Sequence, residues 1–188
     1  MSAKKSIWTP ANVVTCARVV LVPLWLLVAE LVGVPSGETL SWSAMGVFAF
    51  FLLISLTDKV DGYLARSRNE VTTFGKFLDP IADKMLVTSA MLVFTAWHWM
   101  PAWVVIVVIA REFMVSALRL VAATNGRVIA AGWSGKVKTA STMVCICLML
   151  FGIPHWLNLV CQGVILATTV YSGVEYFAKN WDVFQEKK

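Results

Sequence analysis

Six runs of mostly apolar residues fill nearly all of this chain and limit what it can fold into. A helix needs about 20 such residues to cross the hydrocarbon core of a bilayer. With 59% hydrophobic residues and a mean hydropathy of +0.74, the sequence is too apolar for a soluble domain. The runs are residues 13–34, 41–60, 81–100, 102–123, 139–153 and 156–177.

These runs predict an all-α, polytopic integral membrane protein with six transmembrane helices, forming a single domain over residues 1–188. The fifth run is short for a span unless its helix begins earlier, near Ser134. We expect Pro80 in the first turn of the third helix, where no backbone donor is needed. Beyond the six runs, no room is left for a second, soluble domain.

Basic residues predict the orientation of the spans. The turns after the first, third and fifth runs hold no Lys or Arg. Under the positive-inside rule, both termini and the loop between the second and third runs are therefore cytoplasmic. The net charge of +5 then indicates topology and attraction to anionic membrane lipids, and not nucleic-acid binding. The residues on the cytoplasmic side are Lys4, Lys5, Arg66, Arg68, Lys76, Arg127, Lys136, Lys138, Lys179, Lys187 and Lys188.

Four aspartates stand in this apolar sequence in the pattern D-x2-D-G-x2-A-R-x8-G-x3-D-x3-D. If both segments are helical, each pair projects from one helix face. Four carboxylates around one point would repel one another unless divalent cations lay between them, which favours a two-metal phosphoryl-transfer site at the membrane surface. Aspartates that only cap helix ends would explain one pair, but not the whole pattern. Its fixed positions are Asp58, Asp61, Gly62, Ala65, Arg66, Gly75, Asp79 and Asp83.

This pattern resembles the signature of the CDP-alcohol phosphotransferases, membrane enzymes that join a CDP-activated group to an alcohol. The resemblance implies two divalent cations, Mg²⁺ or alternatively Mn²⁺, held by all four aspartates. It also implies that Asp83 is the catalytic general base, that an acceptor hydroxyl attacks the lipid-side phosphorus of a CDP-lipid, and that CMP leaves. The family further suggests a homodimer, a location in the cell membrane and an active site that faces the cytoplasm.

Several residues are candidates for binding the CDP-lipid. Gly62 and Ala65 leave room for a bulky ligand beside the aspartates. Arg66 presents a charged fork that suits a diphosphate, although alone it would be read as an interfacial anchor. Gly75 permits a turn or a close helix approach that brings the second aspartate pair back. The resemblance adds two further contacts to the CDP-linked substrate, from Asn12 and Thr72.

Arg111 is the strongest candidate for binding a second substrate. It follows Pro101 by ten residues, about 15 Å at helical rise, and so lies near the bilayer midplane. Arginine at that depth is costly and normally faces a cavity or a partner. The simpler interpretation is an internal ion pair with Glu112.

Three more basic residues, nearer the cytoplasmic ends of the helices, would extend this pocket: Arg119, Lys136 and Lys138. Each alone could simply extend toward the lipid headgroups. Because the two lysines point roughly 200° apart on a helix, we expect only one of them to enter the pocket. Together with Arg111, these residues suit an acceptor that itself carries a phosphate.

The segments IAREFMVSALRL and GKVKTASTM are similar to those of family members that use glycerol-3-phosphate as acceptor. This similarity implies transfer of the phosphatidyl group of CDP-diacylglycerol to glycerol-3-phosphate, giving phosphatidylglycerophosphate and CMP. Inositol phosphate and phosphatidylglycerol are alternative acceptors within the family. A small cation transporter or channel is an alternative of another class, because it too needs intramembrane acidic and basic residues. It gives no reason for the glycines, alanine and arginine at fixed offsets from the aspartates.

Overall fold

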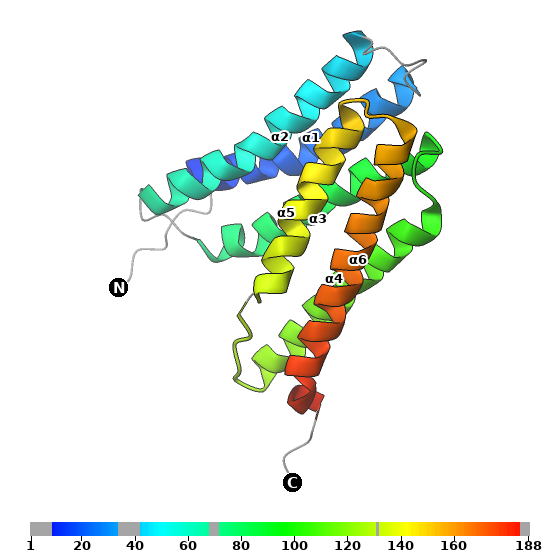
Figure 1. The fold of residues 1–188 in the computed structure, drawn as a ribbon. Helices are drawn as coiled ribbons and strands as arrows, with labels where there is room; N and C mark the ends of the chain where they lie inside the picture. The colour runs from blue at the N-terminus through cyan, green and yellow to red at the C-terminus, as the bar shows by residue number, and fades with distance from the viewer. Residues whose placement is uncertain (1–8, 34–41, 68–71, 131, 185–188) are drawn as a thin grey trace. The chain divides into compact units, whose positions relative to one another are not determined.

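The computed structural model describes residues 9–33, 42–67, 72–130 and 132–184. These described residues form six α-helices and one short 3-10 helix, and they contain no strand (Figure 1). The prediction of an all-α fold is confirmed. The elements are α1 (Pro10–Val32), α2 (Trp42–Ser67), α3 (Thr73–Ala96), α4 (Ala102–Thr124), α5 (Trp133–Leu150), α6 (His155–Lys179) and η1 (Trp181–Phe184).

The beginning of α3 differs from the prediction. The apolar run begins at residue 81, but the helix begins at Thr73, so Pro80 lies inside the helix and not in its first turn. The earlier start has a local cause, because the Thr72 side chain accepts a hydrogen bond from the Gly75 N–H at 3.0 Å and caps the helix. At the other uncertain boundary, α5 begins at Trp133, which confirms a start near Ser134.

Two helices are long and apolar enough to cross a membrane, over Asn12–Val32 and His155–Lys179. A shorter apolar helical stretch covers Trp42–Thr57. Large apolar side chains are exposed on α1, where Val20 is 70% and Leu31 78% accessible. Exposed large apolar side chains on a helix of spanning length suit a surface that faces lipid.

The chain divides into two compact units, and the first comprises residues 1–97 and 150–152. In this unit α1 packs against both α2 and α3. Trp25 of α1 is fully buried, its ring lies 5.4 Å from that of Phe51, and its indole N–H donates to the Val47 carbonyl at 2.9 Å. The buried ring packs α1 against α2, and the directional hydrogen bond of its N–H fixes how the two helices face each other.

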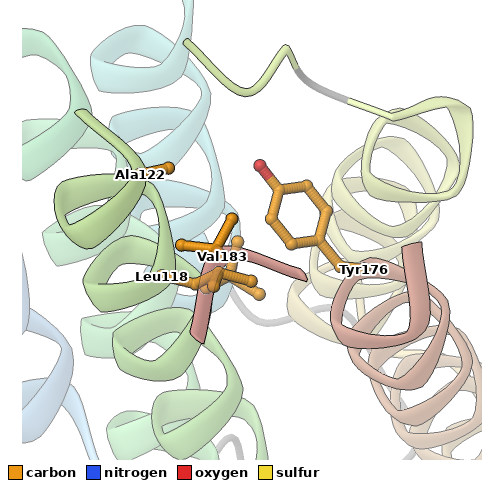
Figure 2. Close-up of a cluster of buried hydrophobic side chains, with 5 residues drawn as sticks. Leu118, Ala122, Tyr176 and Val183 are labelled. Atoms are coloured by element: carbon orange, nitrogen blue, oxygen red, sulfur yellow. The ribbon is translucent and has the colours of Figure 1, made fainter. Parts of the chain in front are cut away.

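The second unit comprises residues 98–149 and 153–188. Figure 2 shows how α4, α6 and η1 meet in it: Leu118 and Ala122 of α4 face Tyr176 of α6 and Val183 of η1. This apolar cluster lies toward the C-terminal ends of α4 and α6. Nothing in the division into units tests the single-domain prediction, which stays a prediction.

Candidate active site

The second aspartate pair is held by α1. Asp79 and Asp83 lie one turn apart on α3. The Thr15 hydroxyl donates to Asp79 Oδ1 at 3.0 Å, and Arg18 Nη1 donates to Asp83 Oδ1, also at 3.0 Å. Two residues one turn apart on α1 thus match two carboxylates one turn apart on α3.

Burial differs sharply across the Arg18–Asp83 ion pair. The Arg18 side chain is completely buried, whereas 55% of the Asp83 side chain is exposed. The cation therefore approaches the carboxylate from inside the unit. Asp83 is oriented from behind while part of its carboxylate side chain faces outward, where a ligand can reach it.

Thr15 and Arg18 were not among the site residues predicted from the sequence. A signal for Arg18 was present, because an arginine in the middle of an apolar run is costly and normally has a partner or a function. Thr15 carried no such signal. Its role follows only from the rotation of α1 against α3.

The first half of the motif can be followed only through its backbone. Residues 58–66 lie in α2, so the helical segments assumed for both aspartate pairs are confirmed. The side chains of this half lie outside the described residues, so the roles predicted for Asp58, Asp61, Gly62, Ala65 and Arg66 stay predictions. Within the described part of the chain, no three or more His, Cys, Asp or Glu side chains group together, so the four-carboxylate arrangement stays a prediction.

The donor set that is described suits a hard divalent cation. Asp79 and Asp83 supply carboxylate oxygens from adjacent turns of one helix, and Mg²⁺ and Mn²⁺ prefer such oxygen ligands. Thr15 contacts one oxygen of Asp79 and Arg18 contacts one oxygen of Asp83, as outer partners of metal ligands do. The residues present therefore fit a divalent cation.

Three residues predicted to bind the CDP-lipid meet at the N-terminus of α3. The Thr72 hydroxyl accepts from Asn12 Nδ2 at 2.8 Å and from the Gly75 N–H at 3.0 Å, and it donates to Asn12 Oδ1 at 3.0 Å. These contacts use the one donor and both lone pairs of a hydroxyl. The structure thus brings Asn12, Thr72 and Gly75 together and connects α1 to the start of α3.

Gly75 confirms the close helix approach expected of it. A Cβ at this position would lie 2.7 Å from Asn12 Oδ1 and 3.3 Å from Thr72 Oγ1. No alanine fits there without displacing the Asn12 amide. The absence of a side chain at Gly75 is therefore part of how the Asn12–Thr72 contact forms.

In the second unit, the structure brings together two of the four basic residues assigned to the acceptor. Glu112 Oε1 accepts from Arg111 Nη1 and from Lys138 Nζ, each at 2.9 Å. Lys138 is only 4% exposed, whereas Lys136 is an exposed residue. Only Lys138 of the two lysines is buried, and that one of them enters an acceptor pocket stays a prediction.

The internal pair of Arg111 with Glu112, raised as the simpler interpretation, is present. It leaves Arg111 with other donors, because a guanidinium has five N–H groups. Arg111 Nε is buried and has no hydrogen-bond partner among the described residues. The ion pair therefore does not use up the capacity of Arg111 to bind an anion.

Arg119 makes a different set of contacts. Its Nε donates to the Tyr176 hydroxyl at 2.7 Å, and its guanidinium carbon lies 5.3 Å from the centre of the Tyr176 ring. Neither Arg119 nor Lys136 has a described contact to the Arg111–Glu112–Lys138 cluster. The structure thus brings Arg111 and Lys138 together through Glu112, while the assignment of all four basic residues to the acceptor stays a prediction.

Comparison with known proteins adds a consistent set of similarities. A family model described as CDP-alcohol phosphatidyltransferase matches residues 8–174. A Bacillus subtilis protein named CDP-diacylglycerol–glycerol-3-phosphate 3-phosphatidyltransferase is 40% identical over 186 residues, covering 93% of this chain and 96% of the relative. An Escherichia coli K12 protein of the same name is 38% identical, covering 78% of this chain and 79% of its own. A Mycobacterium tuberculosis protein named as a probable phosphatidylglycerophosphate synthase is 38% identical over 90% of this chain and 80% of its own.

The contact around Gly75 leads to a prediction for stability. Gly75→Ala forces Asn12 away from Thr72, and overpacking of this kind costs about 1–3 kcal/mol. Gly46→Ala on α2 is the matched control, because a Cβ there meets nothing within 4 Å and alanine favours a helix. Thermal unfolding of both purified variants in detergent should show a lower midpoint for Gly75→Ala and an unchanged or higher one for Gly46→Ala. Equal midpoints would contradict the close contact.

Proposed function

The chain belongs to the CDP-alcohol phosphatidyltransferase family and is a phosphotransferase, and from this premise we propose that it transfers the phosphatidyl group of CDP-diacylglycerol to glycerol-3-phosphate. The products would be phosphatidylglycerophosphate and CMP. The observation that carries the choice of acceptor is the buried pair of cations, Arg111 and Lys138, in the second unit. An acceptor with a phosphate gives these buried charges an anion to bind. The names of the relatives from three bacteria support the same choice.

We propose six transmembrane helices with both termini in the cytoplasm and the chemistry at the cytoplasmic face of the cell membrane. Support comes from the six described helices, from the two that are long and apolar enough to span, and from the distribution of Lys and Arg between alternate turns. The cytoplasmic face is also where a water-soluble phosphorylated acceptor is present. A homodimer is supported by the resemblance to the family alone.

We propose that Asp58, Asp61, Asp79 and Asp83 hold two divalent cations, Mg²⁺ or Mn²⁺. Support comes from the motif, from the two helices that carry it, and from the oxygen donors of the described pair. When bound, the cations would supply positive charge that neutralises a diphosphate and stabilises the attacking and leaving oxygens. Thr15 and Arg18 would keep the second pair of carboxylates oriented.

The chemical step then divides among the residues of the chain. The acceptor hydroxyl oxygen forms a bond to the lipid-side phosphorus, and the bond from that phosphorus to the bridging oxygen breaks, so that CMP leaves with the electron pair. Asp83 would take the hydroxyl proton, and Arg66 would bind the diphosphate. Gly62 and Ala65 would leave room for the CDP-lipid, and the cluster of Asn12, Thr72 and Gly75 would contact it.

At the acceptor side, the chain's task is to bind a dianion and to orient a hydroxyl. Arg111 and Lys138 lie close enough together for one phosphate group to accept from both. Arg119 and Lys136 would extend this basic surface toward the cytoplasm. Held by its phosphate, glycerol-3-phosphate would present a carbon-bound hydroxyl to the reacting phosphorus.

An acceptor panel tests the proposal directly. Purified protein with CDP-diacylglycerol and Mg²⁺ should release CMP when glycerol-3-phosphate is added, and much less with inositol-1-phosphate, myo-inositol, serine or phosphatidylglycerol. The lipid product, identified by mass spectrometry, should be phosphatidylglycerophosphate. Efficient use of another acceptor would replace the assigned substrate. No CMP release with any acceptor would favour the transporter or channel alternative.

Aspartate substitutions test the metal site. Asp58→Asn, Asp61→Asn, Asp79→Asn and Asp83→Asn should each remove most of the turnover, because a shared two-cation site depends on every ligand. Asp182→Asn, an exposed carboxylate in η1, is the matched control and should turn over normally.

A substitution at a residue that contacts one of these carboxylates should give an intermediate loss of turnover. Thr15→Val removes the hydrogen bond to Asp79 and should cost roughly 10–100-fold, as the loss of an outer partner of a metal ligand does. Turnover at increasing Mg²⁺ measures these effects. Near-normal turnover in any two of the four aspartate variants would contradict the two-metal assignment.

Substitution of the basic residues tests the acceptor pocket. A charged hydrogen bond contributes about 1.5–3 kcal/mol, so Arg111→Gln and Lys138→Gln should each raise the KM for glycerol-3-phosphate roughly tenfold to a hundredfold. Lys136→Gln should have a much smaller effect, because that residue is exposed. Arg66→Gln should instead raise the KM for CDP-diacylglycerol. An unchanged KM for glycerol-3-phosphate in both inward-facing variants would place the pocket elsewhere.

A further inference from the structure

One carboxylate oxygen serves two buried cations in the second unit. Glu112 Oε1 lies 2.9 Å from Arg111 Nη1 and 2.9 Å from Lys138 Nζ. The two nitrogens can therefore be no more than about twice that distance apart. Arg111 is 9% and Lys138 4% exposed, so water screens their charges poorly.

The charges in this cluster do not balance. The other described carboxylates of the unit, Glu175 and Asp182, pair with Lys179 and Arg127. Among the described residues, Glu112 is thus the only carboxylate bound to Arg111 or to Lys138. Two buried cations with one anion leave a positive charge, and burying such a charge is costly unless a further anion binds.

The Arg111 side chain is closely surrounded, yet one of its donors is unsatisfied. The unit places glycines at two points against its side chain: a Cβ at Gly173 would lie 3.2 Å from Arg111 Cγ, and one at Gly135 would lie 3.8 Å from Nη2. Arg111 Nε is buried without a hydrogen-bond partner in the described part of the chain. A buried, unsatisfied donor on an excess positive charge indicates that the cluster is incomplete without an anionic ligand.

We propose that Glu112 is a positioning residue, which holds Arg111 and Lys138 side by side and thereby presets the distance at which they bind the acceptor's phosphate. The inference rests on the proposed function and deepens it. Glu112 does not touch the reacting atoms. It acts through the two cations, whose remaining donors contact the phosphate.

This arrangement also excludes uncharged acceptors. When Glu112 is the only anion beside Arg111 and Lys138, the cluster keeps a positive charge. A bound phosphate supplies the negative charge that compensates it. A neutral alcohol such as glycerol would displace water from the cluster without balancing it. Discrimination against the wrong acceptor then comes from an unpaired buried charge as well as from lost hydrogen bonds.

The test is Glu112→Gln, which keeps the size of the side chain and removes its charge. Without that charge the two cations repel each other at low dielectric and move apart. We expect the KM for glycerol-3-phosphate to rise roughly tenfold to a hundredfold, with the kcat at saturation and the KM for CDP-diacylglycerol within about twofold of wild type. Glu175→Gln is the matched control, because it breaks a Lys–Glu pair on α6 outside the cluster and should change none of the three.

A double-mutant cycle separates positioning from a general structural role. In a Lys138→Gln background only one cation remains, so no pair is left to hold at a set distance. Glu112→Gln should then raise the KM for glycerol-3-phosphate far less than it does in wild type. A residue that only stabilised the fold would give equal losses in both backgrounds. Equal losses, or an unchanged KM in the single variant, would overturn the proposal.

Glu112→Asp keeps the test decisive if Glu112→Gln cannot be purified folded. It retains the charge on a side chain one methylene shorter, so we expect a smaller but measurable rise in the KM for glycerol-3-phosphate. No rise would overturn the inference. If the wild-type protein released no CMP in response to glycerol-3-phosphate, the proposed function itself would be overturned. If the wild type were active and the KM of Glu112→Asp were unchanged, only the role of Glu112 would be overturned.

Discussion

Charges inside apolar helices must have partners, and this requirement fixes how the helices of each unit face one another. Taking an arginine or lysine out of water costs several kcal/mol unless a counter-charge compensates it. In the first unit Arg18 satisfies the requirement through Asp83, which joins α1 to α3. In the second, Glu112 joins α4 to α5 through Lys138. The rotation of each helix follows from these contacts, and the exposure of the Asp83 carboxylate and the closeness of Arg111 to Lys138 depend on that rotation.

The sequence predicted the helical architecture because apolar runs of spanning length can be read without knowledge of packing. It placed the start of α3 too late for the same reason. The first two turns of that helix carry polar residues and glycine, and a search for apolar runs does not see them. Their helical start depends on the cap formed by Thr72, a residue predicted from the sequence only to contact the substrate. One side chain therefore has a structural task in addition to the functional one proposed for it.

The candidate site was predictable in its residue types but not in its contacts. Helical geometry requires Lys136 and Lys138 to point in different directions, yet only the rotation of α5 decides that Lys138 is the buried one. In the same way, the motif identifies Asp79 and Asp83, but the partners behind them are 64 and 65 residues away in the chain. Contacts over such separations have no local sequence period, which is why Thr15 went unnoticed.

The Arg18–Asp83 pair has a consequence for how the protein is made. The two residues are 65 positions apart, and synthesis proceeds at about 5–20 residues per second, so Arg18 exists for several seconds before its partner does. On the proposed topology, the first helix enters the bilayer during that interval with an uncompensated arginine. Insertion of an arginine near the centre of a helix costs about 2.5–3.5 kcal/mol, a cost that the surrounding apolar residues must offset. The high apolar content of α1 thus makes membrane insertion feasible before the site it supports has been synthesised.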